Sequence, residues 1–240
     1  MWNGLLMRFP ALIFLLALCC GLANGCWKGV GRATTAAVLS VQGRVIFWNA
    51  EQNNFQPVTL NSRIHDGDTV RTSDGALMDL ALIPAALTHV SANSEIKIEE
   101  LRITKDGNQT DGGMRDRSAR IRLSQGTITV LFSKADKSAS HLSIDARQVG
   151  ISVDSDCLFR VQTDDTTTRV MCGRGKIYVS VGAQSPVTIA AGYFQQWPSA
   201  GPGPLPVADD ATAQIDITES LGIGDQLRKL QSDWQNRRPF

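Results

Sequence analysis

The sequence predicts an all-β protein with an N-terminal signal segment and one C-terminal amphipathic helix. Between residues 38 and 197, short runs rich in Val, Ile, Leu and Thr alternate with clusters of Gly, Asp, Asn and Ser. Such runs are typical of strands separated by turns, and no long helical period interrupts them. Beyond residue 214, apolar residues recur at helical spacing. This pattern fits many short strands in a solenoid or sandwich-like body, and a barrel also stays open.

Residues 1–25 have the features of a secretory signal peptide. Arg8 supplies a positive charge, and the apolar run that begins at Ala11 is too short to span a membrane. Cleavage after Gly25 gives a simply secreted protein. A bacterial lipoprotein signal at the same boundary makes Cys26 the lipidated first residue, and an uncleaved anchor is a third alternative. We therefore expect an exported protein of the periplasm, or a lipoprotein of the outer membrane or cell surface, that meets a membrane only through Cys26.

The length of the chain bounds the size of its core, and its net charge bears on the class of partner. The chain has 240 residues, and 24 Lys and Arg against 23 Asp and Glu leave a formal net charge of +1. This length allows a sizeable core. A nearly balanced charge gives no electrostatic reason to expect a nucleic acid partner.

The mature chain divides into four parts. We expect an N-terminal linker at 26–37, a β domain at 38–197, a Pro/Gly-rich linker at 198–214 and a helix at 215–236. Asp216, with Glu219 three residues later, predicts a capping box at the start of this helix, and Thr218 is a competing cap. Its apolar stripe either packs on the β domain or docks on another protein or subunit. The stripe consists of Ile223, Leu227, Leu230 and Trp234.

Three glycines punctuate the β domain at comparable places. Gly67, Gly126 and Gly175 each come just before a strand that contains Val or Ile. Glycine at such a corner permits a positive φ or a bulge without steric cost. The three positions suggest repeated corners, as in a solenoid, although their spacing is irregular.

Two cysteines, Cys157 and Cys172, lie in the β domain. If residues 163–166 close a hairpin, the two cysteines lie opposite each other, and their side chains share one face. An oxidising compartment would permit a disulfide, which contributes roughly 3 kcal/mol for a loop of this size. A pair of buried free thiols and a register slip of one residue are the alternatives.

Several segments of the β domain, taken in order, resemble the FecR domain family. The segment from Ile64 to Thr72 resembles the most recognisable part of that family, with Gly67 and Asp68 before a strand that ends in Thr72. Later elements around Gly126 and Gly175 also resemble it. The segment around Cys157 departs from the Gly-Thr of the family.

This resemblance implies a binding and regulatory role. FecR proteins are membrane-spanning regulators of sigma factors, and their periplasmic part senses an outer-membrane transducer. The sequence shows no counterpart of their cytoplasmic anti-sigma segment or internal membrane helix. We therefore expect a stand-alone exported FecR-domain protein with a role in signalling.

The residues that could carry chemistry do not form a recognisable catalytic motif. His65, His89 and His141 are isolated in the sequence, and Asp66 and Asp68 fit a glycine turn better than a metal loop. We expect no enzyme activity, no metal and no cofactor. The leading interpretation is an envelope module that binds a protein or a polysaccharide. A self-associating scaffold and a carbohydrate-active enzyme are the alternatives.

Overall fold

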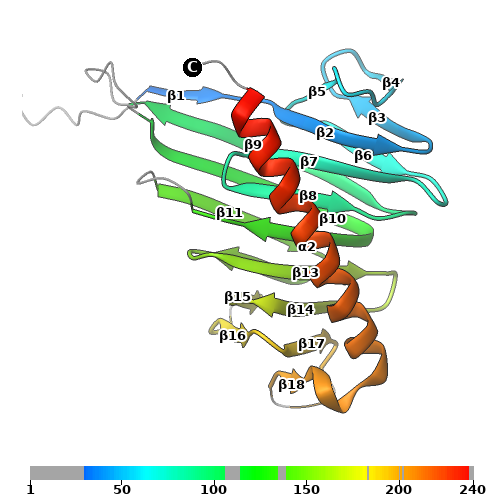
Figure 1. The fold of residues 1–240 in the computed structure, drawn as a ribbon, viewed down its shortest axis with the longest axis vertical. Coiled ribbons are helices and arrows are strands. Elements are labelled where there is room, and N and C mark those ends of the chain that lie inside the picture. The colour runs from blue at the N-terminus through cyan, green and yellow to red at the C-terminus, as the bar shows by residue number, and fades with distance from the viewer. Residues whose placement is uncertain are drawn as a thin grey trace, which may run out of the picture.

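The fold is all-β with one C-terminal helix, as the sequence predicts (Figure 1). The computed structural model describes residues 30–105, 114–134, 139–182, 184–199, 201 and 203–237. The predicted signal segment 1–25 and Cys26 lie outside these ranges. Within them, no helix combines the length and apolar character that a membrane span requires.

The strands form two facing sheets, here called sheet A and sheet B. In both sheets neighbouring strands are antiparallel, except that β10 and β11 run parallel. Strand β10 (Met114–Phe132) belongs to both, since its first half pairs in sheet A and its second half in sheet B. The two sheets are therefore joined by a continuous strand.

Sheet A has β4 at one end and β16 at the other. In order, it contains β4 (Asn54–Pro57), β3 (Val45–Asn49), β6 (Thr69–Thr72), β9 (Glu95–Lys105), β10, β11 (Ala139–Ala146), β12 (Val149–Val153), β15 (Lys176–Val181) and β16 (Val187–Ala190), with β1 (Val30–Ala33) beside β9.

Sheet B covers one face of sheet A. In order, it contains β5 (Arg63–Ile64), β2 (Ala36–Gln42), β7 (Leu77–Ile83), β8 (Ala86–Val90), β10, β13 (Cys157–Thr163), β14 (Thr168–Arg174), β17 (Tyr193–Trp197) and β18 (Leu205–Pro206).

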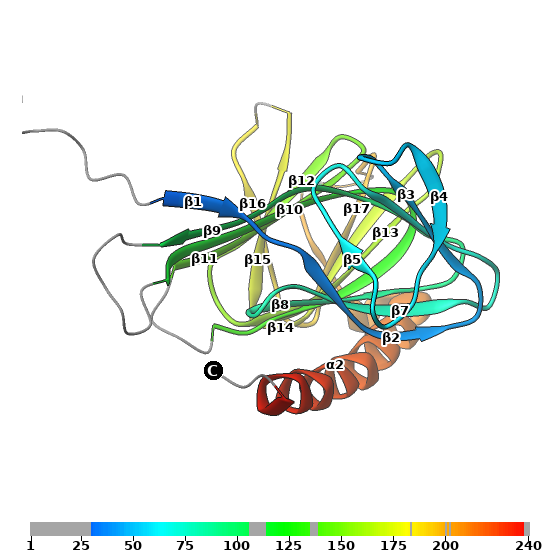
Figure 2. The same cartoon turned by 90° about the horizontal axis from the view of Figure 1, so that it is seen from above.

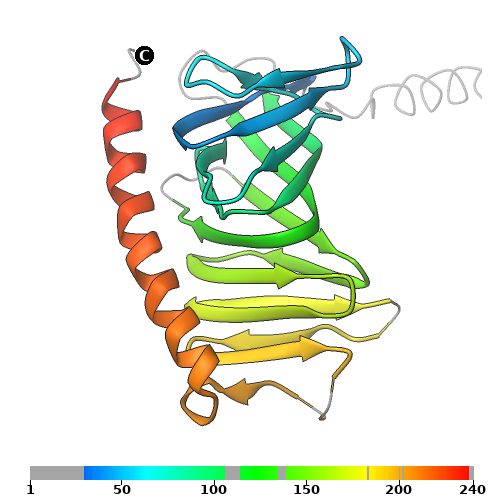
Figure 3. The ribbon, with the colours of Figure 1, turned by 90° about the vertical axis from the view of Figure 1, so that its right-hand side faces the viewer.

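The chain repeatedly crosses from one sheet to the other at a glycine with positive φ. Gly126 (φ 93°) lies at the crossing within β10, and Gly175 (φ 75°) lies between β14 and β15. A Cβ on Gly126 would lie 2.5 Å from the Cα of Ser94, and one on Gly175 would lie 2.2 Å from the carbonyl oxygen of Asp156. Only glycine fits here, since both φ and the close neighbour exclude a side chain. The glycine corners suggested by the sequence are therefore present in the structure. They connect antiparallel strands that are stacked in two sheets (Figure 3).

The core fills the space between the sheets. Residues alternate between buried and less buried positions along most strands, as in β11, where Leu142, Ile144 and Ala146 are buried. The inward side chains of both sheets form one continuous cluster. Interdigitated aliphatic side chains of this kind supply the main favourable free energy of folding.

Helix α2 (Ala211–Arg237) forms a third layer on the outer face of sheet B (Figure 2). It runs diagonally across β14, β13, β10 and β8 (Figure 1). Leu227 is fully buried there, against a small cluster that includes Leu87, Leu131 and Leu158. Of the two interpretations of the stripe, packing on the β domain is the one that the structure shows.

The helix begins at Ala211, after the short 3-10 helix η1 (Val207–Asp209), and not at residue 215. The side chain of Asp210 accepts a hydrogen bond from the Ala213 amide at 2.7 Å, so Asp210 caps the helix. The predicted capping box at Asp216 and Glu219 is therefore wrong. Both carboxylates pair instead with Arg160 on sheet B.

Both predicted linkers contain strand residues. Strand β1 and the first two residues of β2 lie within 26–37, because residues 30–33 pair with the end of β9. Strand β18 lies within 198–214, where Leu205 pairs with Phe194. Proline lacks the amide proton, but it is compatible with a short edge strand.

Candidate binding cleft

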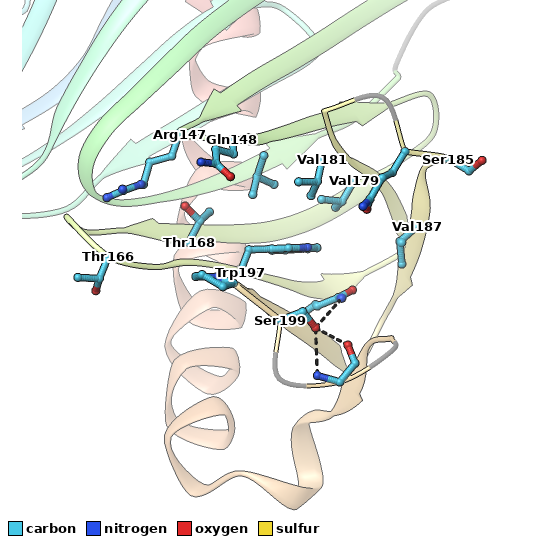
Figure 4. Close-up of a pocket in the computed structure, with 15 residues that line it drawn as sticks. Arg147, Gln148, Thr166, Thr168, Val179, Val181, Ser185, Val187, Trp197 and Ser199 are labelled. Carbon is cyan, nitrogen blue, oxygen red and sulfur yellow. Dashed lines mark hydrogen bonds between the residues drawn. The ribbon is translucent and has the colours of Figure 1, made fainter.

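A cleft of about 460 Å³ opens between the two sheets, at the end of the strands remote from Gly175 and Gly192 (Figure 4). The register of β14 and β17 places it there. Cys172 and Tyr193 pair near the corner, and Thr168 and Trp197 pair at the cleft. The turns at this end supply the rim. A volume in this range is typical of small-molecule sites.

The deeper walls of the cleft are apolar. Val149 on β12 and Val179 on β15 are almost fully buried. Trp197, at the end of β17, is half-buried and packs partly on the core. Its side chain lies between the wall that carries Val181 and the turn that carries Ser199 (Figure 4). The indole thus belongs to both the core and the cleft.

Amide and hydroxyl groups supply the polar part of the lining. They come from both sheets and from the turns between strands, so the chain brings together groups that are far apart in sequence. They are Gln148, Thr166, Thr168, Gln184, Ser185, Gln195 and Ser199.

Gln195 is the polar residue whose hydrogen bonding is incomplete. It is 6% exposed, and its Oε1 is buried without a hydrogen-bond partner. Its Nε2 donates to Ser199 Oγ at 3.5 Å, and Ser199 Oγ in turn accepts from the Gly201 amide at 3.2 Å. Among the described residues that line the cleft, only Gln195 has such an unpaired buried atom. A buried carbonyl without a partner is costly, so a ligand that donates to it gains that energy.

The rim is held by two turns that contact each other. Arg147 has a positive φ of 55°, which is uncommon for a residue with a side chain. Its Nη1 donates to the backbone carbonyl oxygen of Asp164 at 2.7 Å. The Asp164 carboxylate accepts hydrogen bonds from the Thr166 and Thr167 amides, each at 2.7 Å, and these bonds lower the pKa of Asp164. The turn of β13–β14 is thereby fixed beside the cleft.

The lining is suited to binding and offers no acid–base pair. Arg147 is the single charged residue among those that line the cleft, and no His, Cys, Asp or Glu lies there. In the described part of the chain, no group of three or more His, Cys, Asp and Glu residues could hold a metal ion. The arrangement can therefore orient a ligand through hydrogen bonds and apolar contact.

The residues that resemble the FecR motif hold the fold together. Asp68 is 1% exposed, and its carboxylate accepts hydrogen bonds from the amides of Ala50 at 2.9 Å and His65 at 2.8 Å. Thr72 Oγ1 donates to the Ser91 carbonyl oxygen and accepts from the Ser94 amide. Gly67, like the corner glycines, has a positive φ of 91°. These residues do not line the cleft.

The predicted register of the cysteine hairpin is wrong. Thr163 pairs with Thr168, and Phe159 rather than Cys157 lies opposite Cys172. The reason is Asp164, whose carboxylate closes a turn over residues 164–167, one residue further along than expected. Cys157 lies opposite Phe132 instead.

Both cysteines are free and buried in the structure. A shift of two residues keeps both side chains on the inner face of sheet B, where they join the core. Burial raises the pKa of Cys157 and, to about 11, that of Cys172. Few thiolates form at neutral pH, so neither cysteine is an activated nucleophile.

A second polar cluster, beneath helix α2, was not visible in the sequence. The buried Asp79 carboxylate accepts a hydrogen bond from Ser40 Oγ at 2.5 Å, and His89 Nδ1 lies 2.7 Å from its other oxygen. Gln226 on the helix donates to the same carboxylate at 3.3 Å. A nucleophilic serine requires direct contact with the imidazole, but here the carboxylate lies between them. The cluster fastens the helix to sheet B.

Comparisons with known proteins give structural matches to part of the chain. No family model matches the sequence, and no curated protein matches it. Two crystal structures of a candidate anti-sigma factor from Parabacteroides distasonis are similar to the chain. They share 14% and 15% identity with it at a TM-score of 0.40. Each match covers 57% of this chain and 57% of the other, so the chain spans little more than half the length of those proteins.

Sequence reasoning missed the cleft because no local motif marks it. Trp197 and Gln195 appear in the sequence only as the end of the last strand of the β domain. They meet Arg147 and Gln148 because β17 and the β11–β12 turn lie at the same end of opposing sheets. The register of the two sheets, which the sequence does not specify, creates this proximity.

Proposed function

We propose that this chain is an exported, non-catalytic binding module of the bacterial cell envelope. Its role is regulatory or sensory, like that of the FecR periplasmic domain that its motifs resemble. The observation that carries the proposal is the buried, unpaired Oε1 of Gln195 in a cleft between the sheets. A domain of this kind acts through what it binds, and in this cleft Gln195 offers a buried acceptor without a partner.

The partner is an envelope protein or a polysaccharide. The near-neutral net charge of the chain does not favour nucleic acid as the partner, because nucleic acid binding depends on clustered cations. The features of residues 1–25 favour export, and lipidation of Cys26 would supply the membrane contact. No cofactor enters the proposal.

Capture from envelope extracts tests this function. The mature chain, the Gln195→Met variant and the Phe55→Ala variant are each immobilised and exposed to an extract of envelope proteins and glycans. Phe55 lies on β4, at the edge of sheet A opposite β16, and is 53% exposed. We expect a saturable component that the parent and Phe55→Ala capture equally and that Gln195→Met retains at least tenfold more weakly.

Equal capture by all three chains would contradict the proposal, because the cleft would then have no part in recognition. Fractionation gives an independent check. The proposal predicts that the processed chain is found in the envelope, with a lipid adduct on Cys26 if it is a lipoprotein. An intact precursor in the cytosol would remove the basis for an envelope role.

A further inference from the structure

The cleft already restricts the kind of ligand that fits it. The strands β12, β14 and β15, which contribute much of its wall, each pair with neighbours on both edges. An extended peptide bound by strand addition requires a free edge with unpaired backbone groups. These three strands offer none, so recognition along them depends on side chains.

The side chains in question are amides and hydroxyls. An amide side chain presents both a donor and an acceptor, and a serine or threonine hydroxyl can act as either. Gln148, Gln184 and Gln195 line the same cleft as Thr166, Ser185 and Ser199. The ligand that matches such a set carries many groups that both donate and accept, which is the property of a sugar hydroxyl. The buried Gln195 Oε1 calls for a donor in particular.

The polar lining of the cleft is mostly uncharged, which suits an uncharged ligand. Arg147 is the one charged residue in the lining, and no carboxylate lines it. The guanidinium already donates to the carbonyl oxygen of Asp164, and the Asp164 carboxylate belongs to the same turn. This hydrogen bond directs the guanidinium to the Asp164 turn, so uncharged amides and hydroxyls make up the rest of the polar lining.

Trp197 supplies a flat apolar surface in the cleft. An aromatic ring offers a flat apolar surface, and its indole N–H gives it a polar edge. A pyranose ring has an apolar face of C–H groups and a periphery of hydroxyls. It can lie on such a ring while its hydroxyls reach the surrounding amides. The valines of the walls, Val149, Val179 and Val181, enclose the site from the other side.

We propose that the cleft binds a neutral sugar unit of an envelope polysaccharide, with its apolar face on Trp197 and a hydroxyl donating to Gln195 Oε1. This inference rests on the proposed function, because it names the ligand class of the same cleft. It does not rest on the FecR resemblance, whose motif residues lie elsewhere.

Calorimetric titration with defined oligosaccharides tests the inference. The probes are neutral hexasaccharides of glucose, xylose, mannose, galactose and N-acetylglucosamine, with hexagalacturonate as the charged comparison. We expect at least one neutral probe to bind the parent chain saturably, and hexagalacturonate to bind more weakly. Gln195→Met and Trp197→Ala should each weaken binding at least tenfold, whereas Trp197→Phe should retain an intermediate affinity. Phe55→Ala should bind as the parent does.

The variants must remain folded for this comparison to be valid. Gln195→Met replaces an amide that lacks one hydrogen bond, so it should preserve the fold even if Trp197→Ala does not. Circular dichroism and thermal unfolding establish that each variant is native. The Gln195→Met result then decides the proposal by itself.

The outcomes separate this inference from the broader function. If no neutral probe binds the parent, or if Gln195→Met binds as tightly as the parent, the sugar assignment is overturned. If the envelope capture described above nevertheless depends on Gln195, the cleft binds an envelope component of another class and the proposed function stands. If neither sugar binding nor capture depends on Gln195, both proposals fail.

Discussion

Two glycines in helix α2 allow a direct test of how closely the helix approaches sheet B. Gly224 is buried, and a Cβ built on it would lie 2.6 Å from Cδ2 and 2.9 Å from Cδ1 of Leu158. Leu158 is fully buried, so it has little room to move away. Gly222 is exposed, and a Cβ there would meet nothing within 4 Å. The two positions are thus matched in helix context and differ in packing.

Alanine at Gly222 should stabilise the protein by about 0.5–1 kcal/mol, because alanine has the higher helix propensity. Alanine at Gly224 should gain the same propensity but force Leu158 or the helix to shift. Overpacking of this kind costs about 1–3 kcal/mol. We therefore expect Gly224→Ala to be less stable than Gly222→Ala by about 1–3 kcal/mol.

Urea denaturation measures this difference directly, with the m value as the check that only stability has changed. In thermal unfolding, each kcal/mol corresponds to about 2–4 °C for a protein of this size. Equal stabilisation by the two substitutions would refute the reasoning, because it would mean that the helix does not lie against Leu158 at Gly224.

Three further predictions concern the corner, the rim and the cysteines. Gly126→Ala should lower the free energy of unfolding by about 2–5 kcal/mol, because backbone strain and overpacking add together. Gly75→Ala, whose Cβ would meet nothing within 4 Å, should lower it by about 1–2 kcal/mol from backbone strain alone. Urea denaturation measures both values. The lowered pKa of Asp164 means that its contribution to stability is present above about pH 4 and is lost as the pH falls further, so Asp164→Ala should flatten the acid limb of a stability–pH profile. Cys157 and Cys172 should resist iodoacetamide at pH 8 in the native protein and react fully once unfolded without reductant, as mass spectrometry will show.

Each of these predictions has an outcome that contradicts it. Equal costs at Gly126 and Gly75 would mean that the corner does not need the close approach to the neighbouring strand. If the acid limb is unchanged in Asp164→Ala, the Asp164 carboxylate does not stabilise the turn. A native mass lower by two hydrogens, with no alkylation after unfolding, would show that Cys157 and Cys172 are bridged.

The sequence was sufficient for the fold class because hydrophobic alternation and turn residues are local signals. It also located the helical stripe around Leu227, which packs on sheet B. The start of the helix was misplaced, because Asp216 has the pattern of a cap but is used to pair with Arg160. Competing uses of one side chain are decided by tertiary neighbours, which a local pattern does not contain.

The register of the cysteine hairpin also depends on side-chain contacts that a local sequence pattern does not contain. Four polar residues lie in that turn, and several of them can close it. Asp164 decides the register by accepting hydrogen bonds from two amides of the turn. A change of one position in the turn moves the partner of Cys172 by two residues, from Cys157 to Phe159. Register is therefore the property most sensitive to side-chain detail.

The position of the cleft follows from how the two sheets are joined. At the corner, Gly126 and Gly175 bring neighbouring backbone so close that no side chain fits, which leaves no space for a ligand. The outer face of sheet B is covered by helix α2. At the opposite end the chain turns within a sheet, as at residues 164–167, and does not cross, so the sheets are free to separate. A site between the sheets can therefore form at the turns and not at the glycines, and variation in the turns can change the ligand without disturbing the corner.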